Sequence, residues 1–305
     1  MISQSVKEAL QRFVPVENIR FDEPLKNHTT FRVGGAADCM VFVQSVEQMQ
    51  KVLGYLQKVE IPFFVMGNGS NLLVGDKGYR GVILRLAESM SDVAVVGNRV
   101  IAKAGASLAK VARVALEHGL AGFEFAAGIP GTVGGAVIMN AGAYDGEMKM
   151  VVDDVTVMDS QGALMVLDNE TMEFGYRTSA IKKQKFVVTE CRFLLQPGNK
   201  DDIKAKMDDF GARRREKQPL EYASAGSTFK RPEGNFAGKL IMDAGLRGFT
   251  VGGAQVSEKH CGFVINTGDA TAADIKNLME KVQEEVYRQF SVKLEPEVIM
   301  LGEFA

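Results

Sequence analysis

Three polar residues stand in sequence contexts that could support chemistry. Arg177 lies in a Gly-Tyr-Arg-Thr-Ser run, Ser227 in Ala-Gly-Ser-Thr, and Glu297 follows Pro296 in an otherwise apolar segment. A guanidinium can bind a carboxylate, and a hydroxyl or carboxyl can exchange a proton. Each also fits an ordinary role, in a surface salt bridge, a turn or a sheet edge. The chain shows no Gly-x-Ser-x-Gly elbow and no Ser-His-Asp order, so a serine hydrolase is not indicated.

Residues 122–145, called the glycine segment below, are dense in glycine and carry few charges. A solvent-exposed linker would be rich in serine, lysine and glutamate instead. Because glycine lacks a Cβ, this composition predicts buried backbone that approaches another group closely. That group is either a neighbouring element, as in a buried crossover, or an anionic or carbonyl-rich ligand held by backbone N–H groups.

A second glycine loop, residues 66–72 (Met-Gly-Asn-Gly-Ser-Asn-Leu), follows a predicted strand and is called the cofactor loop below. It begins like the G-x-G of a dinucleotide fingerprint. The third glycine is missing, however, and strand-like sequence follows, which argues against a Rossmann domain. The loop is either a tight turn or a phosphate-binding loop that uses its backbone N–H groups with Ser70 and Asn71.

Composition narrows the class of protein. The 305 residues are 46% hydrophobic and 24% charged with a net charge of −2, which is typical of a globular protein without a global basic field for nucleic acid or membrane. No apolar run approaches the roughly 20 residues of a spanning helix, and no signal peptide is evident. The three cysteines and three histidines are scattered. We therefore expect no disulfide, no metal site and a cytoplasmic location.

Hydrophobic periodicity predicts alternating helices and strands early in the chain and a strand-rich middle. A Pro-Gly-Asn-Lys run at 197–200 predicts a boundary, and a charged helix follows whose basic run at 213–217 is either a solvated face or a contact for a phosphorylated substrate. Predicted strands are 37–43, 61–66, 81–86, 93–96, 99–103, 154–159, 163–167, 186–195, 262–266 and 292–301. Predicted helices lie at the N-terminus, after Ser45, after Ser107, at 201–217, at 236–244 and after Thr271.

The motifs in combination resemble the UDP-N-acetylenolpyruvoylglucosamine reductases, the MurB flavoenzymes of bacterial cell-wall synthesis. The resemblance covers nearly the whole chain. It rests on the Asn-His-Thr-Thr-Phe-Arg-Val-Gly-Gly run at 27–35, the cofactor loop, Gly-Ile-Pro-Gly-Thr-Val-Gly-Gly at 128–135, Asn-Ala-Gly-Ala-Tyr at 140–144, and the segments around Arg177, Ser227 and Glu297.

The resemblance implies an α+β fold with a two-lobed FAD-binding domain of the vanillyl-alcohol-oxidase (PCMH) type and a smaller α+β substrate-binding domain. The lobes would be residues 1–75 and 76–200, and the substrate domain 201–305, with the last strand near 292–301 returning toward the FAD domain. FAD would be noncovalent. Its predicted binding residues are Met66, Gly67, Asn68, Gly69, Ser70, Asn71, Leu72, Ala127, Gly128, Ile129, Pro130, Gly131, Thr132, Gly134, Gly135, Asn140, Ala141, Gly142 and Ala143.

The resemblance also implies the reaction and its residues. NADPH would reduce FAD, and hydride would then pass to the methylene carbon of the enolpyruvyl ether of UDP-N-acetylglucosamine. Arg177 matches the family's cation at the substrate carboxylate, Glu297 the acid that stabilises the enolic intermediate, and Ser227 the proton donor. Lys230, Arg231 and Arg247 are candidates for the diphosphate, and we expect a monomer. Only a short turn, 180–185, follows Arg177, so the chain resembles the shorter branch that lacks a substrate-covering tyrosine loop.

Two other functions remain open at the level of sequence. One is a different noncovalent FAD oxidase or dehydrogenase of the same fold, acting on an alcohol or a lactone. The other is a UDP-sugar-binding module without catalysis, in which Ser227 and Glu297 are ordinary structural residues. Binding of FAD alone would not separate the reductase from the oxidase.

Overall fold

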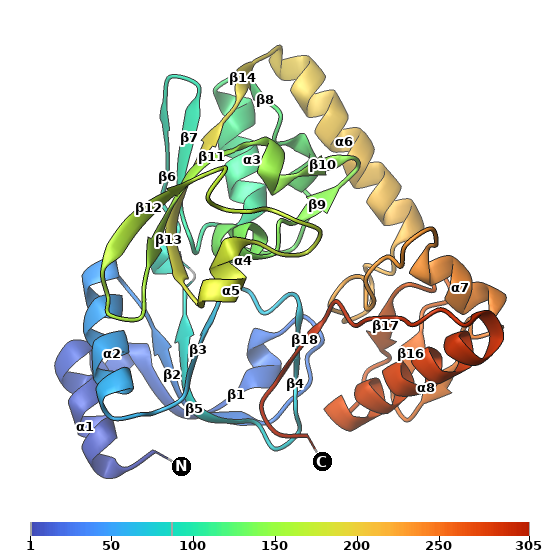
Figure 1. Ribbon diagram of the computed structural model, residues 1–305, viewed down its shortest axis with the longest axis horizontal. Helices are drawn as coiled ribbons and strands as arrows, with labels where there is room; N and C mark the ends of the chain where they lie inside the picture. The colour runs from blue at the N-terminus through green and yellow to red at the C-terminus, as the bar shows by residue number, and fades with distance from the viewer. Residues whose placement is uncertain (1, 87, 305) are drawn as a thin grey trace. The chain divides into compact units, whose positions relative to one another are not determined.

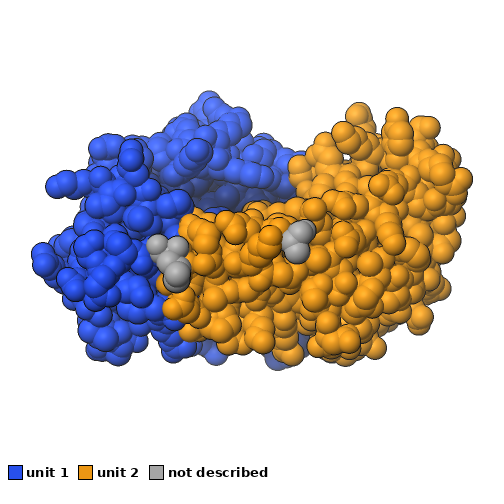
Figure 2. All heavy atoms as spheres, turned by 90° about the horizontal axis from the view of Figure 1, so that it is seen from below, with its two compact units in different colours: residues 1–21, 39–68, 81–213 blue, residues 22–38, 69–80, 214–305 orange. Residues whose placement is uncertain are grey.

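The structure is a computed structural model that describes residues 2–86 and 88–304 (Figure 1). The chain forms two compact units, coloured separately in Figure 2. Unit 1 comprises residues 1–21, 39–68 and 81–213, and unit 2 comprises residues 22–38, 69–80 and 214–305. The division into two FAD-binding lobes and a substrate domain, expected from the sequence, stays a prediction.

Unit 1 contains a five-stranded antiparallel sheet in the order β12-β11-β13-β7-β6. Its strands are β6 (Val93–Val96), β7 (Arg99–Lys103), β11 (Val152–Met158), β12 (Leu164–Asp168) and β13 (Val187–Leu194). Helix α3 (Leu108–Glu117) contacts β6 and β7, and the short helix α4 (Val133–Ile138) contacts β7 and β13. Alternate apolar residues of the central strands, such as Val155, Val157 and Phe193, are fully buried in the core. The glycine segment is thereby fixed against the sheet through α4.

A four-stranded sheet in the order β1-β2-β5-β3 is built from β1 (Ile19–Pro24), β2 (Ala36–Phe42), β5 (Tyr79–Arg85) and β3 (Phe63–Met66). Strands β3 and β5 run parallel. Helix α2 (Val46–Lys58) separates β2 from β3 in sequence and contacts α1 (Gln4–Phe13). The Ser45 hydroxyl accepts a hydrogen bond from the backbone of Gln48, the cap that the sequence predicted.

Unit 2 contains a three-stranded sheet, β15 (Thr250–Val251), β16 (Ala254–Val256) and β17 (Val264–Asn266), with α7 (Ala237–Asp243) and the long helix α8 (Ala272–Phe290). Thr271 and Asp274 form the predicted capping box at the start of α8. Asp76 adds a second cap, because its two carboxylate oxygens accept from Ala272 N and Ala273 N at 2.8 and 2.9 Å. Strand β18 (Ile299–Leu301) pairs in parallel with β4 (Leu72–Val74). The end of the chain thus lies beside the strand that follows the cofactor loop.

Most predicted elements are present, but one is shorter than predicted and several observed elements were not predicted. The predicted strand 292–301 forms only over Ile299–Leu301, because residues before it make isolated contacts rather than a ladder. Helix α4, the five-residue helix α5 (Ala180–Gln184) and strands β1, β4, β15 and β16 were not predicted. Helix α6 spans Lys200–Lys217. The remaining short elements are η1 (Val16–Asn18), η2 (Leu25–His28), η3 (Glu88–Met90), β8 (Leu120–Ala121), η4 (Glu124–Ala126), β9 (Gly142–Ala143), β10 (Gly146–Glu147), η5 (Met148–Met150) and β14 (Gln196–Pro197).

Two further findings concern predictions from composition. Cys39, Cys191 and Cys261 are buried and carry free thiols. Among the residues that the structure describes, no helix is both long and apolar enough to cross a membrane.

Candidate functional site

The start of the cofactor loop and the glycine segment touch each other in unit 1. A Cβ placed on Gly67 would lie 2.1 Å from Thr132 Oγ1, far inside van der Waals contact. Two segments that were selected separately from the sequence therefore meet at a glycine where no other side chain fits. Within the glycine segment itself, a Cβ on Gly142 would lie 2.7 Å from Gly146 O, which confirms there the close approach predicted from its composition.

A cavity of about 400 Å³ opens beside this contact. Its walls come from β3, from Gly67, Thr132, Gly134 and Gly135, and from the α5–β13 region. Apolar side chains such as Phe63, Phe64 and Ile138 cover most of the surface. An apolar cavity with a glycine-lined side suits a flat ring system whose polar chain runs along the backbone.

Helix α5 brings two cations to the cavity that sequence reasoning missed. Lys182 and Lys185 line it together with Ile181, and Lys185 adopts a left-handed backbone with φ of 58° where α5 ends. In the sequence, the short turn after Arg177 was noted only because it lacks the substrate-covering tyrosine loop. Its two cavity-lining lysines carry no local sequence signal for a site, because only the folded chain brings α5 to the cavity wall.

The first N–H groups of α4 are already occupied. Val133 N donates to Ala106 O and Gly134 N donates to Ala104 O, both at 2.9 Å. These two donors hold the helix against the turn after β7, so they are not free to bind an anion. Anion binding by backbone N–H groups is therefore better placed in the cofactor loop.

The second half of the cofactor loop belongs to unit 2 and lies against the Asn-His-Thr-Thr motif. Thr30 N donates to Gly69 O at 3.3 Å, and the Thr30 hydroxyl is buried without a hydrogen-bond partner among the described residues. A buried unpaired hydroxyl is costly unless a ligand completes it. Asn71 Nδ2 donates to the backbone oxygen of Glu297 at 3.1 Å. The loop thus offers one unsatisfied polar atom and is tied to the segment that carries Glu297.

Arg177 sits in unit 1 on a tight four-residue hairpin, residues 175–178, called the arginine hairpin below. Gly175 and Thr178 exchange backbone hydrogen bonds of 3.1 and 3.3 Å, and Arg177 has a positive φ of 55°. Asn140 Nδ2 donates to Gly175 O at 3.2 Å, and the buried Ser179 hydroxyl donates to Ile138 O at 2.8 Å. The guanidinium lies 5.1 Å from the centre of the Tyr176 ring. The hairpin is therefore anchored to the end of the glycine segment.

Asn140 was predicted to bind the cofactor, and the structure shows what its side chain contacts. Besides Gly175 O, its amide nitrogen donates to Glu147 Oε2 at 3.0 Å, and its oxygen accepts from Lys149 N at 2.9 Å. Both amide hydrogens and the oxygen are thereby used within unit 1, and the residue is buried. A contact with a cofactor would have to use its backbone.

The segments that carry Ser227 and Glu297 are neighbours in unit 2, although the two residues are 70 positions apart in the sequence. Glu297 N donates to Thr228 O at 2.9 Å, and Phe229 bridges Pro296. Ser227 itself pairs with Phe263 across an isolated bridge and is exposed, whereas Glu297 is half-buried. The segment 225–229, called the serine segment below, therefore presents an accessible hydroxyl one residue from the backbone contact with Glu297.

The three cations proposed for the diphosphate all lie in unit 2, with different partners. Lys230 Nζ pairs with Glu295 at 3.1 Å, and Arg247 Nε donates to Glu258 O at 2.6 Å. The Arg231 guanidinium stacks on the exposed Phe236 ring at 3.9 Å. Lys230 is adjacent to the serine segment in sequence, which places it nearest of the three to Ser227 along the chain.

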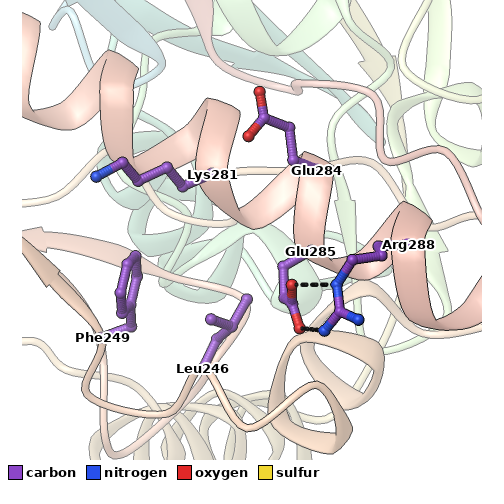
Figure 3. Close-up of a pocket in the computed structure, with 6 residues that line it drawn as sticks. All are labelled: Leu246, Phe249, Lys281, Glu284, Glu285 and Arg288. Carbon is purple, nitrogen blue, oxygen red and sulfur yellow. Dashed lines mark hydrogen bonds and ion pairs between the residues drawn. The ribbon is translucent and has the colours of Figure 1, made fainter.

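A second hollow, of about 430 Å³, lies on unit 2 beside α8 (Figure 3). Arg288 Nε donates to Glu285 at 2.8 Å, and this contact, with a further hydrogen bond from Gln289, lowers the pKa of Glu285 to about 2. Leu246 and Phe249 face these charges across the hollow. All six lining residues lie outside the site predicted from the sequence.

Comparison with known proteins agrees with this geometry. Residues 37–168 match a family described as the FAD binding domain, and residues 218–301 match the C-terminal domain of UDP-N-acetylenolpyruvoylglucosamine reductase. A structure of an alkyldihydroxyacetonephosphate synthase matches with a TM-score of 0.51 at 14% identity, over 65% of this chain and 41% of that one. This likeness concerns the fold alone. The chain is thus an FAD-binding protein of the predicted α+β class, with a second domain.

The more similar proteins define the family. A UDP-N-acetylenolpyruvoylglucosamine reductase from Caldanaerobacter subterraneus is 49% identical over 302 residues, covering 99% of this chain and all of the relative. One from Clostridioides difficile is 50% identical with the same coverage. The crystal structure of the reductase (MurB) from Thermus caldophilus superposes with a TM-score of 0.80 at 36% identity, over 93% of this chain and 98% of that one. The chain belongs to the UDP-N-acetylenolpyruvoylglucosamine reductase family.

Proposed function

We propose that the protein catalyses the NADPH-driven reduction of the enolpyruvyl ether of UDP-N-acetylglucosamine to UDP-N-acetylmuramate, a step of peptidoglycan precursor synthesis in the cytoplasm. The observation that carries the proposal is that the segments bearing Ser227 and Glu297 are neighbours in unit 2, because Glu297 N donates to Thr228 O and Phe229 bridges Pro296. A proton donor and a carboxyl group on neighbouring segments suit the protonation of a carbanion-like centre. Membership of the family supports the choice of substrate.

FAD fits the residues that are present. The apolar cavity with its glycine-lined wall and the Gly67–Thr132 approach, both within unit 1, are features that a bound dinucleotide would use. Bound FAD would supply the hydride chemistry, accepting a hydride from NADPH and passing one to the enol ether. The cofactor loop and the glycine segment would hold and orient it, and Lys182 and Lys185 would add positive charge at the cavity wall.

Arg177 would stabilise the charge that develops on the substrate. Hydride addition to the methylene carbon places negative charge on the neighbouring carbon and its carboxylate. A guanidinium stabilises a carboxylate through two parallel hydrogen bonds, and it does so best when it is already in place. The arginine hairpin provides that pre-organisation, because its backbone is closed by hydrogen bonds and tied to Asn140.

Ser227 would donate the proton to that neighbouring carbon, and Glu297 would stabilise the enolic form of the carboxylate. A serine hydroxyl is a weak acid, so it can serve only a strongly basic acceptor in a polarising environment. Lys230 and Arg231 follow Ser227 within four residues and would bind the diphosphate, with Arg247 as a further candidate.

An anaerobic two-step experiment tests the proposal. The FAD-loaded protein is reduced with NADPH while its flavin absorbance is followed, and enolpyruvyl-UDP-N-acetylglucosamine is then added. We expect loss of the yellow colour and then its return, with UDP-N-acetylmuramate as product by mass spectrometry. Bleaching without recovery would reject this substrate, and a flavin that ignores NADPH but reacts with an alcohol and oxygen would favour the oxidase. Protein that binds the UDP-sugar but no FAD would favour the non-catalytic module.

A further inference from the structure

We propose that His260 is a positioning residue for Ser227, acting through a hydrogen bond that its imidazole accepts within the turn 260–263. This inference rests on the proposed function, since it concerns how the proposed proton donor is held. His260 was not singled out for any role in the sequence. Its effect reaches Ser227 through two hydrogen-bonded backbone segments.

The first step is the turn itself. Phe263 N donates to His260 O at 2.9 Å, which closes a turn, and Gly262 N donates to His260 Nδ1 at 3.1 Å. The side chain of His260, the first residue of the turn, thus accepts a hydrogen bond from the backbone N–H of the residue two positions later. Asn and Asp commonly make this contact in turns, and here a histidine nitrogen replaces the side-chain oxygen. The turn is further tied down because His260 N donates to the Ser257 hydroxyl at 3.3 Å.

The second step connects the turn to the serine segment. Thr228 N donates to Gly262 O at 2.9 Å, so Gly262 is held by His260 through its N–H and holds Thr228 through its carbonyl group. Phe263 pairs with Ser227 across the isolated bridge, and Val264 N donates to the Thr228 hydroxyl at 2.9 Å. The conformation of the turn therefore sets the register at which Ser227 lies against this strand.

The third step is that the imidazole has little room to move. A Cβ on Gly262 would lie 2.9 Å from its Cε1, and a Cβ on Gly238 of α7 would lie 3.4 Å from the same atom. The ring also packs edge-on against Phe263, with centroids 4.9 Å apart. Glycines on two sides and an aromatic ring on the third hold the imidazole in the orientation that lets Nδ1 accept.

The fourth step is the protonation state. An accepting Nδ1 requires a neutral ring with its proton on Nε2. Burial lowers the pKa of His260 below its ordinary value of 6.5, so the ring is neutral at physiological pH. Burial thus keeps the ring neutral, and the hydrogen bond from Gly262 N selects the tautomer with its proton on Nε2.

Loss of the His260 hydrogen bond should affect one half-reaction and not the other. Proton transfer depends steeply on the placement of the donor, and a misplacement of about 1 Å can cost on the order of 100-fold in rate. Reduction of the enzyme by NADPH makes no use of Ser227. Loss of the His260 hydrogen bond should therefore slow the half-reaction with the enolpyruvyl substrate and leave the half-reaction with NADPH unchanged.

The test compares His260→Asn with His260→Gln in the FAD-loaded full-length protein. The Asn side-chain oxygen replaces Nδ1 as the acceptor, whereas the Gln oxygen lies one bond further out. In stopped-flow experiments we expect His260→Gln to lower the rate constant for flavin reoxidation by about 10-fold or more, with unchanged bleaching by NADPH, and His260→Asn to stay within about 3-fold of the wild type. Substrate affinity, measured from the concentration dependence, should change less than the limiting rate.

Several results would overturn the inference. These are equal losses in the two variants, equal slowing of both half-reactions, or wild-type reoxidation in His260→Gln. Should both variants fail to fold, ¹⁵N NMR of the wild-type imidazole decides instead, because a proton on Nδ1 would exclude its role as acceptor. A wild-type protein that is reduced by NADPH but not reoxidised by the enolpyruvyl substrate would refute the proposed function, which is a separate outcome.

Discussion

The arginine hairpin of unit 1 and the serine segment of unit 2 hold their proposed catalytic side chains by different means. The hairpin places Arg177 in a left-handed backbone conformation and relies on the side chains of Asn140 and Ser179. The serine segment contains no residue of positive φ except Gly226, and it is held through backbone bridges to Phe263 and Pro296. A left-handed non-glycine residue costs roughly 1–3 kcal/mol, which the surroundings must offset. The backbone of unit 1 is therefore strained at Arg177. In unit 2, the position of Ser227 is instead fixed by the register of its backbone bridges.

This difference predicts where each region fails. The hairpin should be vulnerable to the loss of a single anchoring side chain, because few contacts oppose its strain. The serine segment should tolerate substitution of side chains that do not alter strand register. The predictions that follow test this contrast, beginning with the largest expected effect.

Arg177→Lys should lower the rate of flavin reoxidation by about 100- to 1,000-fold, as for the loss of a main electrostatic contact in a transition state. A lysine keeps the charge but cannot form the planar two-point contact with a carboxylate. Stopped-flow absorbance after anaerobic reduction measures the effect, and reduction by NADPH should be unchanged. Arg113→Lys, on the exposed face of α3, is the matched control. Equal rates in Arg177→Lys and the wild type would remove Arg177 from its role.

Asn140→Ala should destabilise unit 1 by about 1–3 kcal/mol and also slow reoxidation, since it removes the side-chain hydrogen bond to Gly175 O and leaves Lys149 N without the Asn140 oxygen. Asn169 offers a control, because its amide nitrogen donates to Lys149 O and Val152 O at 2.9 and 2.7 Å, away from the arginine hairpin. Asn169→Ala should lower stability in urea denaturation while leaving reoxidation intact. A slowed reaction in both variants would show that general stability, rather than the hairpin anchor, matters.

Gly67→Ala should weaken FAD binding, because the new Cβ would meet Thr132 Oγ1 at 2.1 Å and push the two cofactor segments apart. Fluorescence titration of the apoprotein with FAD measures the dissociation constant. Thr132→Ala in the same chain should restore part of the affinity by removing that oxygen. Gly54→Ala in α2 is the control: nothing lies within 4 Å of its Cβ position, and we expect a neutral effect or a gain of roughly 0.5–1 kcal/mol. Unchanged affinity in Gly67→Ala would refute the predicted course of the cofactor.

The smallest expected effect is a pH dependence in unit 2. The folded-state pKa of His260 is depressed below 6.5 by burial, so the unfolded chain binds the proton more readily. The stabilising contribution is therefore present above pH 6.5 and is lost as the pH falls through the folded-state value. Urea denaturation of the wild type and His260→Asn between pH 5 and 8 should show a gap in stability that changes over this window. A difference in stability between the two proteins that does not change with pH would contradict the depressed pKa of His260.

The sequence predicted well those elements whose signals are local. Ser45, Ser107 and the Thr271–Asp274 box each mark the start of a helix that the structure contains. Helix α4 was missed because its short glycine-containing sequence has low helical propensity and is stabilised by packing against β7 and β13. The predicted strand at 292–301 was too long, since its apolar residues pack individually instead of pairing along a ladder.

The site was only partly accessible from the sequence. Gly67 and Thr132 were both assigned to cofactor binding, but their contact depends on how β3 and α4 pack. The left-handed backbone of Arg177 and the pairing of Ser227 with Phe263 arise from contacts across long stretches of chain. Lys182, Lys185 and His260 had no local motif to reveal them, because their roles depend on which residues lie opposite in the folded chain.

The most direct test of the account is flavin reoxidation in Ser227→Ala. The FAD-loaded variant and the wild type are reduced anaerobically with NADPH, mixed with enolpyruvyl-UDP-N-acetylglucosamine, and followed by flavin absorbance. We predict normal bleaching and a reoxidation rate lower by orders of magnitude, because the hydroxyl that donates the proton is gone while register and charge are kept. Reoxidation at the wild-type rate would show that the proton comes from elsewhere and would contradict the central role given to the serine segment.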